Sequence, residues 1–138
     1  MSELDELYQA IILDHNKRPR HYGALADATH QAEGYNPLCG DKVQVYLIIQ
    51  DDRIKDIQFE AASCAICKAS ASMMIQELQG KTLGEAAERL ERVQLLLSED
   101  VEAVDSDGDL VSLQGVRKFP ARIKCATLPW HTFEDALG

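Results

Sequence analysis

Three of the four cysteines, Cys39, Cys64 and Cys125, stand in sequence settings that suit metal or sulfur chemistry. Asp41 follows the first of them two residues later, the second stands where a strand pattern gives way to a helix pattern, and the third follows a cationic segment. A thiolate, and not a thiol, binds metal and attacks sulfur, so the neighbours of each cysteine decide what it does. Three thiolates and one carboxylate make four donors, the number that a closed tetrahedral zinc site needs.

The segment around Cys39 predicts a tight and rigid turn, because Pro37 and Gly40 bracket the cysteine just before a long strand. Asp41 is near enough in sequence to share a site with Cys39. A thiolate beside a carboxylate suits zinc or iron. These residues alone are equally compatible with a buried cysteine next to an aspartate that stabilises the turn.

Cys64 is placed at the start of a helix, where backbone N–H groups and the helix dipole stabilise a thiolate. Cys67 follows at a Cys-x-x-Cys spacing, which raises the alternative of a thiol–disulfide module. The chain lacks the βαβ context that the thioredoxin pattern needs, so this alternative is weak. Cys67 is interpreted first as a small core residue, and it remains a candidate spare thiol one helical turn from Cys64.

Arg122 and Lys124 give the segment before Cys125 its positive charge. If the segment is helical, Arg122 and Cys125 share a face. Nearby positive charge stabilises a thiolate and also steadies a persulfide or sulfide; the alternative is a surface cation cluster beside a half-buried thiol. Cys64 follows Cys39 by 25 positions and Cys125 follows Cys64 by 61, so a shared site has to be assembled by the fold.

The composition is that of an ordinary globular domain, and the 138 residues predict one domain spanning residues 1–138. A formal net charge of -9 disfavours binding to nucleic acid or to an anionic membrane. Residues 1–6 show no secretory signal pattern, and no apolar run approaches the length of a membrane span. We therefore expect a cytoplasmic protein, in which sets of cysteines point to metal or redox chemistry more often than to structural disulfides.

The first half of the chain reads as a helix followed by a hairpin. Ser2 is a plausible N-cap for a helix ending near Asn16, with Leu4, Leu7, Ile11 and Ile12 on its apolar face. Residues 17–34 read as loop, with a short strand possible at 29–33. Apolar residues alternate over 43–49, and after a turn at 51–52 a second strand carries Ile54, Ile57 and Phe59 inward.

The second half reads as helices. Helical periodicity covers 65–79, with Gly80 as a stop, and 83–97, whereas 99–109 reads as an acidic, flexible surface loop. Two short helical patterns punctuated by Pro120 and Pro129 follow. Strands before helices predict an α+β fold with a small three-stranded antiparallel sheet and helices packed on one face. The four histidines form no ligand spacing, so surface or capping roles are expected for His15, His21, His30 and His131.

Three motifs taken together resemble one family. Asn-Pro-Leu-Cys-Gly-Asp at 36–41, Cys-Ala-Ile at 64–66 running into Ala-Ser-Ala-Ser-Met-Met at 69–74, and Phe-Pro-Ala-Arg-Ile-Lys-Cys-Ala at 119–126 are similar to the IscU/NifU N-terminal scaffold family of iron–sulfur cluster assembly. The long segment between Cys64 and Cys125, and a lysine before the last cysteine, resemble its SufU-like branch. The resemblance covers nearly the whole chain.

That resemblance implies a site and a reaction. SufU-like proteins hold one zinc through residues that match Cys39, Asp41, Cys64 and Cys125. They receive persulfide sulfur from a pyridoxal-phosphate cysteine desulfurase of the SufS type, with the residue matching Cys39 as acceptor. IscU-like members use the same positions to build a [2Fe–2S] cluster and hand it on to apo-proteins, which is the alternative function. Such a protein is at most a sulfurtransferase acting with the desulfurase, and otherwise a scaffold without catalytic activity.

Two residues depart from the family pattern. Cys67 stands where a small residue other than cysteine is usual, so a resolving or alternate thiol is a hypothesis for it. Pro129 falls within what is elsewhere a continuous C-terminal helix, which predicts a kink near Cys125.

Overall fold

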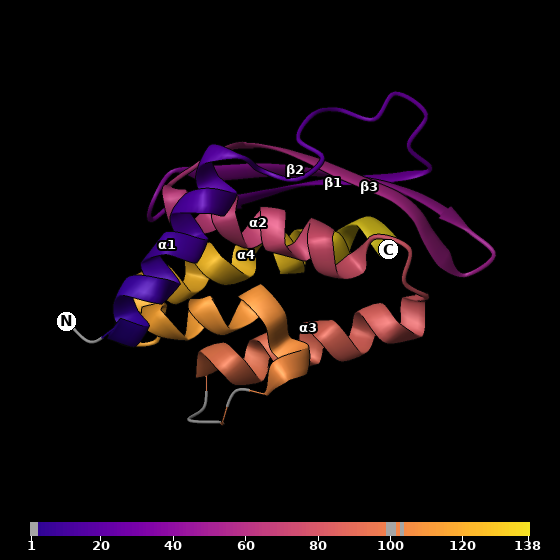
Figure 1. Cartoon of the computed structure of the whole chain (residues 1–138). Helices are drawn as coiled ribbons and strands as arrows, with labels where there is room; N and C mark the ends of the chain where they lie inside the picture. The colour runs from indigo at the N-terminus through magenta and orange to yellow at the C-terminus, as the bar shows by residue number, and fades with distance from the viewer. Residues whose placement is uncertain (1–2, 99–101, 103) are drawn as a thin grey trace.

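The computed structural model describes residues 3–98, 102 and 104–138, and places five helices and one sheet among them (Figure 1). In chain order the elements are α1 (Glu3–Lys17), β1 (His30–Asn36), β2 (Asp41–Gln50), β3 (Arg53–Ala62), α2 (Ala65–Leu78), α3 (Leu83–Ser98), the 3-10 helix η1 (Asp105–Val116) and α4 (Pro120–Leu137). The predicted N-cap at Ser2 lies outside the described residues.

The sheet is an antiparallel meander in the order β1-β2-β3, as the sequence predicts. Asp51 and Asp52, which both have positive φ, form the two-residue turn between β2 and β3. A two-residue loop with both residues in this conformation matches the twist of the strands that it joins. The possible strand at 29–33 is confirmed and continues to Asn36.

One face of the sheet carries the core. Val43, Val45 and Leu47 alternate along β2 and are fully buried. The buried Ile54 and Ile57 of β3 are three positions apart, which breaks strict alternation. The register explains this, because Ile48 pairs with Asp56 whereas Ile49 pairs with Ile54, so one extra residue bulges out of β3.

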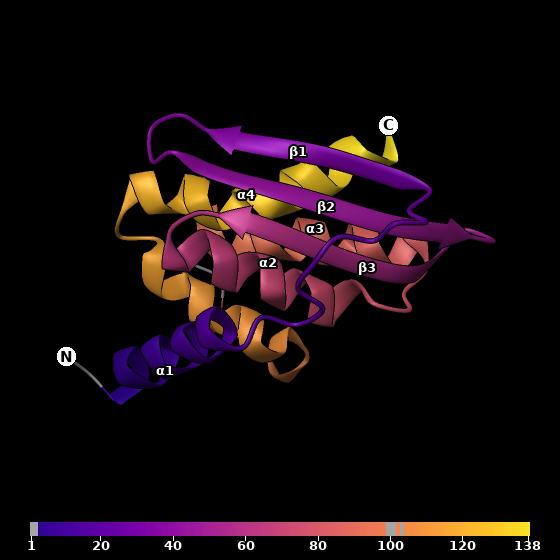
Figure 2. The same ribbon diagram turned by 90° about the horizontal axis from the view of Figure 1, so that it is seen from above.

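Helices α2 and α4 lie against that face, and α1, η1 and α3 lie on their far side (Figures 1 and 2). The prediction of an α+β fold with helices on one face of a three-stranded sheet is confirmed. Ser70 of α2 ties the two central helices together, because its hydroxyl donates to the carbonyl of Ala126 at 2.5 Å and accepts the indole N–H of Trp130 at 3.1 Å. Gly34 of β1 faces Thr132 of α4, where a Cβ would overlap the threonine hydroxyl.

Helix α4 corrects one prediction. The two short helical patterns form one helix that runs from Pro120 to Leu137 and continues through Pro129. Pro120 occupies the first turn, where a missing N–H costs nothing. Pro129 has no N–H to donate to the carbonyl of Cys125, and burial of the adjacent Trp130 and Phe133 stabilises the helix beyond this point.

The acidic segment is also different from its prediction. Residues 105–109 belong to η1, and Asp107 is fully buried. Its carboxylate accepts two hydrogen bonds from Arg92 of α3, at 2.7 and 2.8 Å, and one from the N–H of Val104 at 2.9 Å. A buried carboxylate with a guanidinium partner is the arrangement that offsets desolvation. Periodicity carries no signal for such a pairing.

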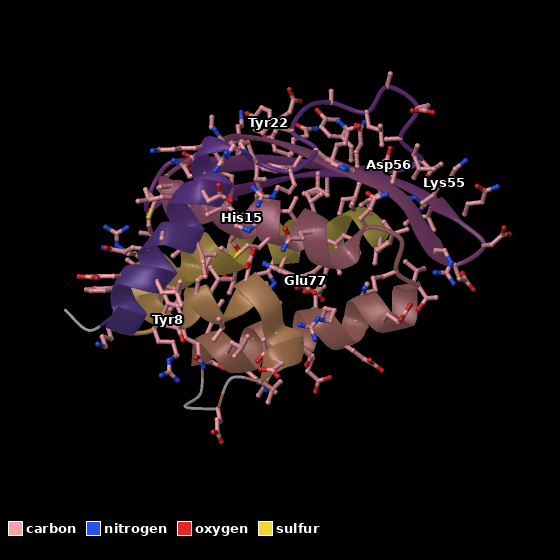
Figure 3. All side chains as sticks on the ribbon, in the orientation of Figure 1. Tyr8, His15, Tyr22, Lys55, Asp56 and Glu77 are labelled. Atoms are coloured by element: carbon pink, nitrogen blue, oxygen red, sulfur yellow. The ribbon has the colours of Figure 1, made fainter. Side chains whose placement is uncertain are left out.

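Helix α1 packs Ile11 and Ile12 of its predicted apolar face against the core, but it departs from the prediction at two other residues. The side chain of Leu7 is 55% exposed, whereas His15 is fully buried, so the predicted surface role for His15 is wrong. Its ring lies where α1 meets α2 and η1 (Figure 3), 2.7 Å from Ser72 Oγ and 2.8 Å from Asp109 Oδ2. The hydroxyl of Ser72 also accepts the N–H of Arg20 at 2.9 Å, so this one side chain links the end of α1 to α2.

Among the helices in the described part of the chain, none combines the length and the apolar character needed to cross a bilayer.

Candidate metal centre

The three segments that carry the candidate ligands meet at one end of the sheet. The β1–β2 turn, the junction between β3 and α2, and the start of α4 all lie at the left in Figure 2. This follows from the topology, because β1 and β3 both run toward that end and α2 begins directly after β3. The packing of α4 across β1 and β2 then brings Cys125 to the same place.

Cys39 stands on the four-residue turn between β1 and β2, which is closed by the pairing of Asn36 with Asp41. The side chain of Asn36 accepts the N–H of Leu38 at 3.2 Å, and Gly40 has a φ of +71° that favours glycine. The turn is therefore specified locally, and it leaves Cys39 exposed. The sequence prediction of a tight turn at this cysteine agrees with this geometry.

Asp41 connects the turn to the start of α2. Its carboxylate is 1% exposed and accepts the backbone N–H of Cys64 through Oδ1 at 2.8 Å. The other oxygen, Oδ2, lies 3.6 Å from Cys64 Sγ. Cys64 is the N-cap of α2, and its sulfur accepts the N–H of Cys67 at 3.4 Å. The backbone bond fixes the carboxylate with one oxygen directed at the thiol.

Cys125, in the second turn of α4, closes the cluster from the other side. Its sulfur lies 3.3 Å from Cys39 Sγ and the side chain is only 2% exposed. Burial, together with the contacts to the Asp41 carboxylate and the Cys39 thiol, raises the pKa of the Cys125 thiol well above its ordinary value. The pocket itself thus disfavours a second anion beside Asp41, and a bound cation would reverse that preference.

The donor set fits a tetrahedral zinc ion. Ligand atoms of Cys39, Asp41 and Cys125 all lie within 4.8 Å of one another. Cys64 is outside that set, yet its sulfur is 3.6 Å from Asp41 Oδ2. Zinc bonds of about 2.0–2.3 Å place tetrahedral ligand atoms roughly 3.5 Å apart, close to the 3.3 Å and 3.6 Å separations seen here. A small inward rotation of Cys64 would complete the four.

The two candidate supporting cations lie outside this cluster. Arg122 and Lys124 of α4 are both exposed. Arg122 lines a groove of about 550 Å³ between the starts of α2 and α4, α1 and the end of η1, together with Lys118, Phe119, Ile66 and Tyr8. Both cations are thus on the exposed surface of α4 close in sequence to Cys125, and none of the four candidate ligands lines the groove that contains Arg122.

The rim of the site is apolar at two points. Leu38, next to Cys39 on the turn, is 70% exposed, and Phe119, at the start of α4, is 54% exposed. Neither residue was predicted to be functional. A large side chain directly beside a candidate ligand on an exposed turn is the signal that would have suggested a contact surface.

Asn36 is a residue of the site that sequence reasoning missed. It is 7% exposed, its Oδ1 holds the turn, and its Nδ2 lies 3.9 Å from Cys125 Sγ. A side-chain amide directed at a sulfur favours the anionic form of that sulfur. Its position directly before a proline and a turn cysteine is the signal for its role in holding the turn. Nothing in the sequence indicates its contact with Cys125.

Cys67 is not among the residues whose ligand atoms cluster at this end of the sheet. It is fully buried in the core of α2, and burial raises the pKa of its thiol to about 12. It is one helical turn from Cys64, and its N–H caps the sulfur of that residue.

A three-stranded meander covered by helices, with thiols and one carboxylate converging at the sheet end, defines an α+β domain with a candidate metal centre assembled from distant segments. Residues 7–126 match the family described as "NifU-like N terminal domain". The chain belongs to this family, which confirms the resemblance inferred from the three motifs.

Two curated relatives cover nearly the whole chain. It is 42% identical to the "Zinc-dependent sulfurtransferase SufU" of Bacillus subtilis (strain 168), over 99% of this chain and 93% of the relative. It is 37% identical to the "Iron-sulfur cluster assembly scaffold protein IscU" of Streptococcus pyogenes serotype M1, over 99% of this chain and 86% of the relative.

Solved structures agree with the fold. A putative iron–sulfur cluster assembly scaffold protein for the SUF system from Fervidobacterium islandicum AW-1 superposes with a TM-score of 0.85 at 33% identity, covering 100% of this chain and 96% of that one. A nitrogen-fixing NifU-like protein (N-terminal) from Brucella abortus gives a TM-score of 0.86 at 26% identity, covering 99% and 95%.

Proposed function

We propose that this chain is a zinc-dependent sulfur acceptor of iron–sulfur cluster assembly, with Cys39, Asp41, Cys64 and Cys125 as its metal ligands. The observation that carries the proposal is the convergence of Cys39, Asp41 and Cys125, with Cys64 Sγ 3.6 Å from Asp41 Oδ2. The Cys39 thiol is exposed, whereas Asp41 and Cys125 are buried. The Bacillus relative named as a zinc-dependent sulfurtransferase supports the same reading.

The four residues have different roles in this proposal. Bound zinc would keep the thiols deprotonated and protected until a sulfur donor arrives. Cys39 is the acceptor because it is on the outer turn, where its thiolate attacks the terminal sulfur of a donor persulfide, forms Cys39–S–SH and releases the donor thiolate. Asp41 and Cys125 hold the base of the site, and Cys64 joins them from the start of α2.

The donor we propose is a pyridoxal-phosphate cysteine desulfurase of the SufS type, and the recipients are downstream iron–sulfur assembly proteins or apo-proteins. The surface of this chain that contacts the desulfurase would include the exposed Leu38 and Phe119 and the cations Arg122 and Lys124. The net charge of -9 argues against nucleic acid or an anionic membrane as partner. The cytoplasmic location expected from the sequence remains a prediction.

The experiment combines metal analysis with persulfide mapping. Protein purified without added metal is assayed for zinc and iron, then mixed with the desulfurase and free cysteine, and each thiol is mapped by mass spectrometry. We expect about one zinc per chain and added sulfur on Cys39. Cys39→Ala is expected to abolish stimulation of the desulfurase; retained stimulation would contradict the acceptor role.

The alternative is a scaffold on which a [2Fe–2S] cluster is built and passed on, which the Streptococcus relative's name supports. The same donors suit a cluster, because thiolates bind iron as well as zinc. The two functions separate on the isolated protein. Stoichiometric zinc without visible colour supports sulfur transfer, whereas a coloured cluster that moves to an apo-protein supports the scaffold.

A further inference from the structure

Cys67 is a thiol that the proposed metal centre does not use. Four donors complete the site without it, and neighbouring core positions of α2 hold alanine or serine, so packing does not require sulfur there. It is fully buried and thus shielded from thiols in solution. The cysteine three residues earlier, Cys64, is the half-buried ligand at the start of the same helix.

Cys64 and Cys67 lie together at the start of α2. Cys64 is the N-cap with extended backbone (φ -69°, ψ 166°), and its sulfur folds back over the helix start to accept the N–H of Cys67 at 3.4 Å. Residues three apart on a helix have Cβ atoms about 5–6 Å apart, against roughly 3.5–4.5 Å in a disulfide. Because the N-cap is outside the rigid helical ladder, a small rotation at Cys64 closes that difference.

We propose that Cys64 and Cys67 form a dithiol/disulfide pair that reduces persulfide sulfur held at this site to hydrosulfide. The proposal rests on the sulfur-acceptor function and adds a release step to it. Cys39 and Cys64 share Asp41 as a neighbour, because Cys39 Sγ lies within 4.8 Å of an Asp41 carboxylate oxygen and Cys64 Sγ lies 3.6 Å from Asp41 Oδ2. Cys64 is the one candidate ligand thiol with a further cysteine one helical turn away.

The release takes place in two balanced steps. The thiolate of Cys64 attacks the terminal sulfur of Cys39–S–SH, which forms Cys64–S–SH and leaves the Cys39 thiolate. Cys67 then gives its proton to the outer sulfur of Cys64–S–S⁻, and the resulting Cys67 thiolate attacks the inner sulfur of Cys64–S–SH. The Cys64–Cys67 disulfide forms, the S–S bond to the outer sulfur breaks, and the outer sulfur leaves as HS⁻. The two cysteine sulfurs are oxidised, the outer sulfur is reduced, and an external dithiol reductant restores the pair.

The step has a consequence for the metal. Disulfide formation removes Cys64 from the donor set, so each release of hydrosulfide also lowers the affinity of the site for zinc. Hydrosulfide and zinc are then expected to leave together. A core role for Cys67 alone predicts neither event.

The test uses zinc-loaded protein and one equivalent of a small persulfide, glutathione persulfide, with no desulfurase and no added reductant. Hydrosulfide is trapped with monobromobimane, zinc is measured with a chromogenic chelator, and disulfides are mapped by mass spectrometry. We expect wild type to release about one hydrosulfide per chain with a Cys64–Cys67 disulfide and free zinc. Cys67→Ser and Cys67→Ala, whose zinc content and Cys39 persulfide report an intact site, are expected to lose at least tenfold in hydrosulfide.

Equal hydrosulfide from wild type and both variants, or a Cys39–Cys125 disulfide in place of Cys64–Cys67, would overturn the proposal. Failure of the sulfur-acceptor function itself gives a different result, which is the absence of zinc or of desulfurase stimulation.

Discussion

Ser72 Oγ and His15 Nδ1, 57 residues apart in the chain, are 2.7 Å apart in the fold. Together with Asp109 on the other ring nitrogen, they join α1, α2 and η1 through one buried imidazole. Both ring nitrogens of His15 therefore have a hydrogen-bond partner, so no polar atom of the buried ring is left unsatisfied. This histidine is a structural element of the helical layer, which explains why no ligand spacing surrounds it.

His15→Ala is therefore expected to reduce the free energy of unfolding by about 2–4 kcal/mol, since it leaves a cavity in the helical layer and removes the hydrogen bonds to the buried Ser72 and the half-buried Asp109. The matched control is His131→Ala, because His131 is 56% exposed and its ion pair with Glu134 is on the surface. The control is expected to stay within about 0.5 kcal/mol of wild type. Urea unfolding followed by circular dichroism checks both, and equal losses would refute the structural role.

Gly34 allows α4 to approach β1. A Cβ at this position would overlap the hydroxyl of the buried Thr132, which the packing of α4 holds in place. Gly34→Ala is expected to lower the free energy of unfolding by about 1–3 kcal/mol through overpacking. Gly84→Ala is the control, because Gly84 begins α3 with open space around it. There alanine is expected to stabilise by up to about 1 kcal/mol; a destabilising control would argue against this reading.

The pairing of Arg92 with Asp107 predicts a pH dependence. The hydrogen bonds from Arg92 hold the pKa of the Asp107 carboxyl below its ordinary value. The stabilisation is thus complete above the unfolded pKa of about 3.9, and it is lost as the pH falls through the lower folded pKa. Asp107→Asn is expected to cost about 1–3 kcal/mol near neutral pH, with the gap to wild type narrowing below pH ~4.

Unfolding measured between pH 3 and 7 tests this sign. Asp105, exposed in the same segment, supplies the control Asp105→Asn, for which a constant and small difference is expected across the range. A gap for Asp107→Asn that widens toward acid pH would contradict the assignment.

Asp41 acts on the metal site through two oxygens, one on the backbone of Cys64 and one beside its sulfur. Asp41→Ala is expected to weaken zinc binding by at least about tenfold, because it removes a donor and releases the start of α2. Asp27→Ala, on an exposed loop, is the charge-matched control. Competition with a chromogenic zinc chelator measures both, and unchanged zinc affinity in the Asp41 variant would exclude the carboxylate as a ligand.

The turn at Cys39 and the helix start at Cys64 could be predicted from the sequence, because each depends on the residues next to it in the chain. The hairpin is equally legible, since Val43, Val45 and Leu47 alternate without interruption. The prediction that Cys125 shares a site with Cys39 and Cys64 came from the family resemblance and not from the spacing of the cysteines. The distances among the three thiols depend on how α4 crosses the sheet, which no local pattern encodes.

Two of the wrong predictions, those for His15 and Asp107, share a physical cause. His15 and Asp107 are polar residues whose burial depends on partners 57 and 15 positions away, so hydropathy assigns them to the surface. Leu7 has the opposite problem, because an apolar residue at helical spacing is still exposed when no element covers it. Pro129 was expected to interrupt a helix that the burial of its neighbours preserves.

The ligands come from three segments that are separated by 25 and 61 positions along the chain. An ion bound to all of them would act as a cross-link, because it ties together stretches that drift apart when the chain unfolds. Resistance to heat should therefore rise with the concentration of free zinc, by an amount that follows from mass action. Proteolysis at low metal concentration would then begin where the cross-link is missing, so metal supply would govern how long each molecule lasts as well as what it does.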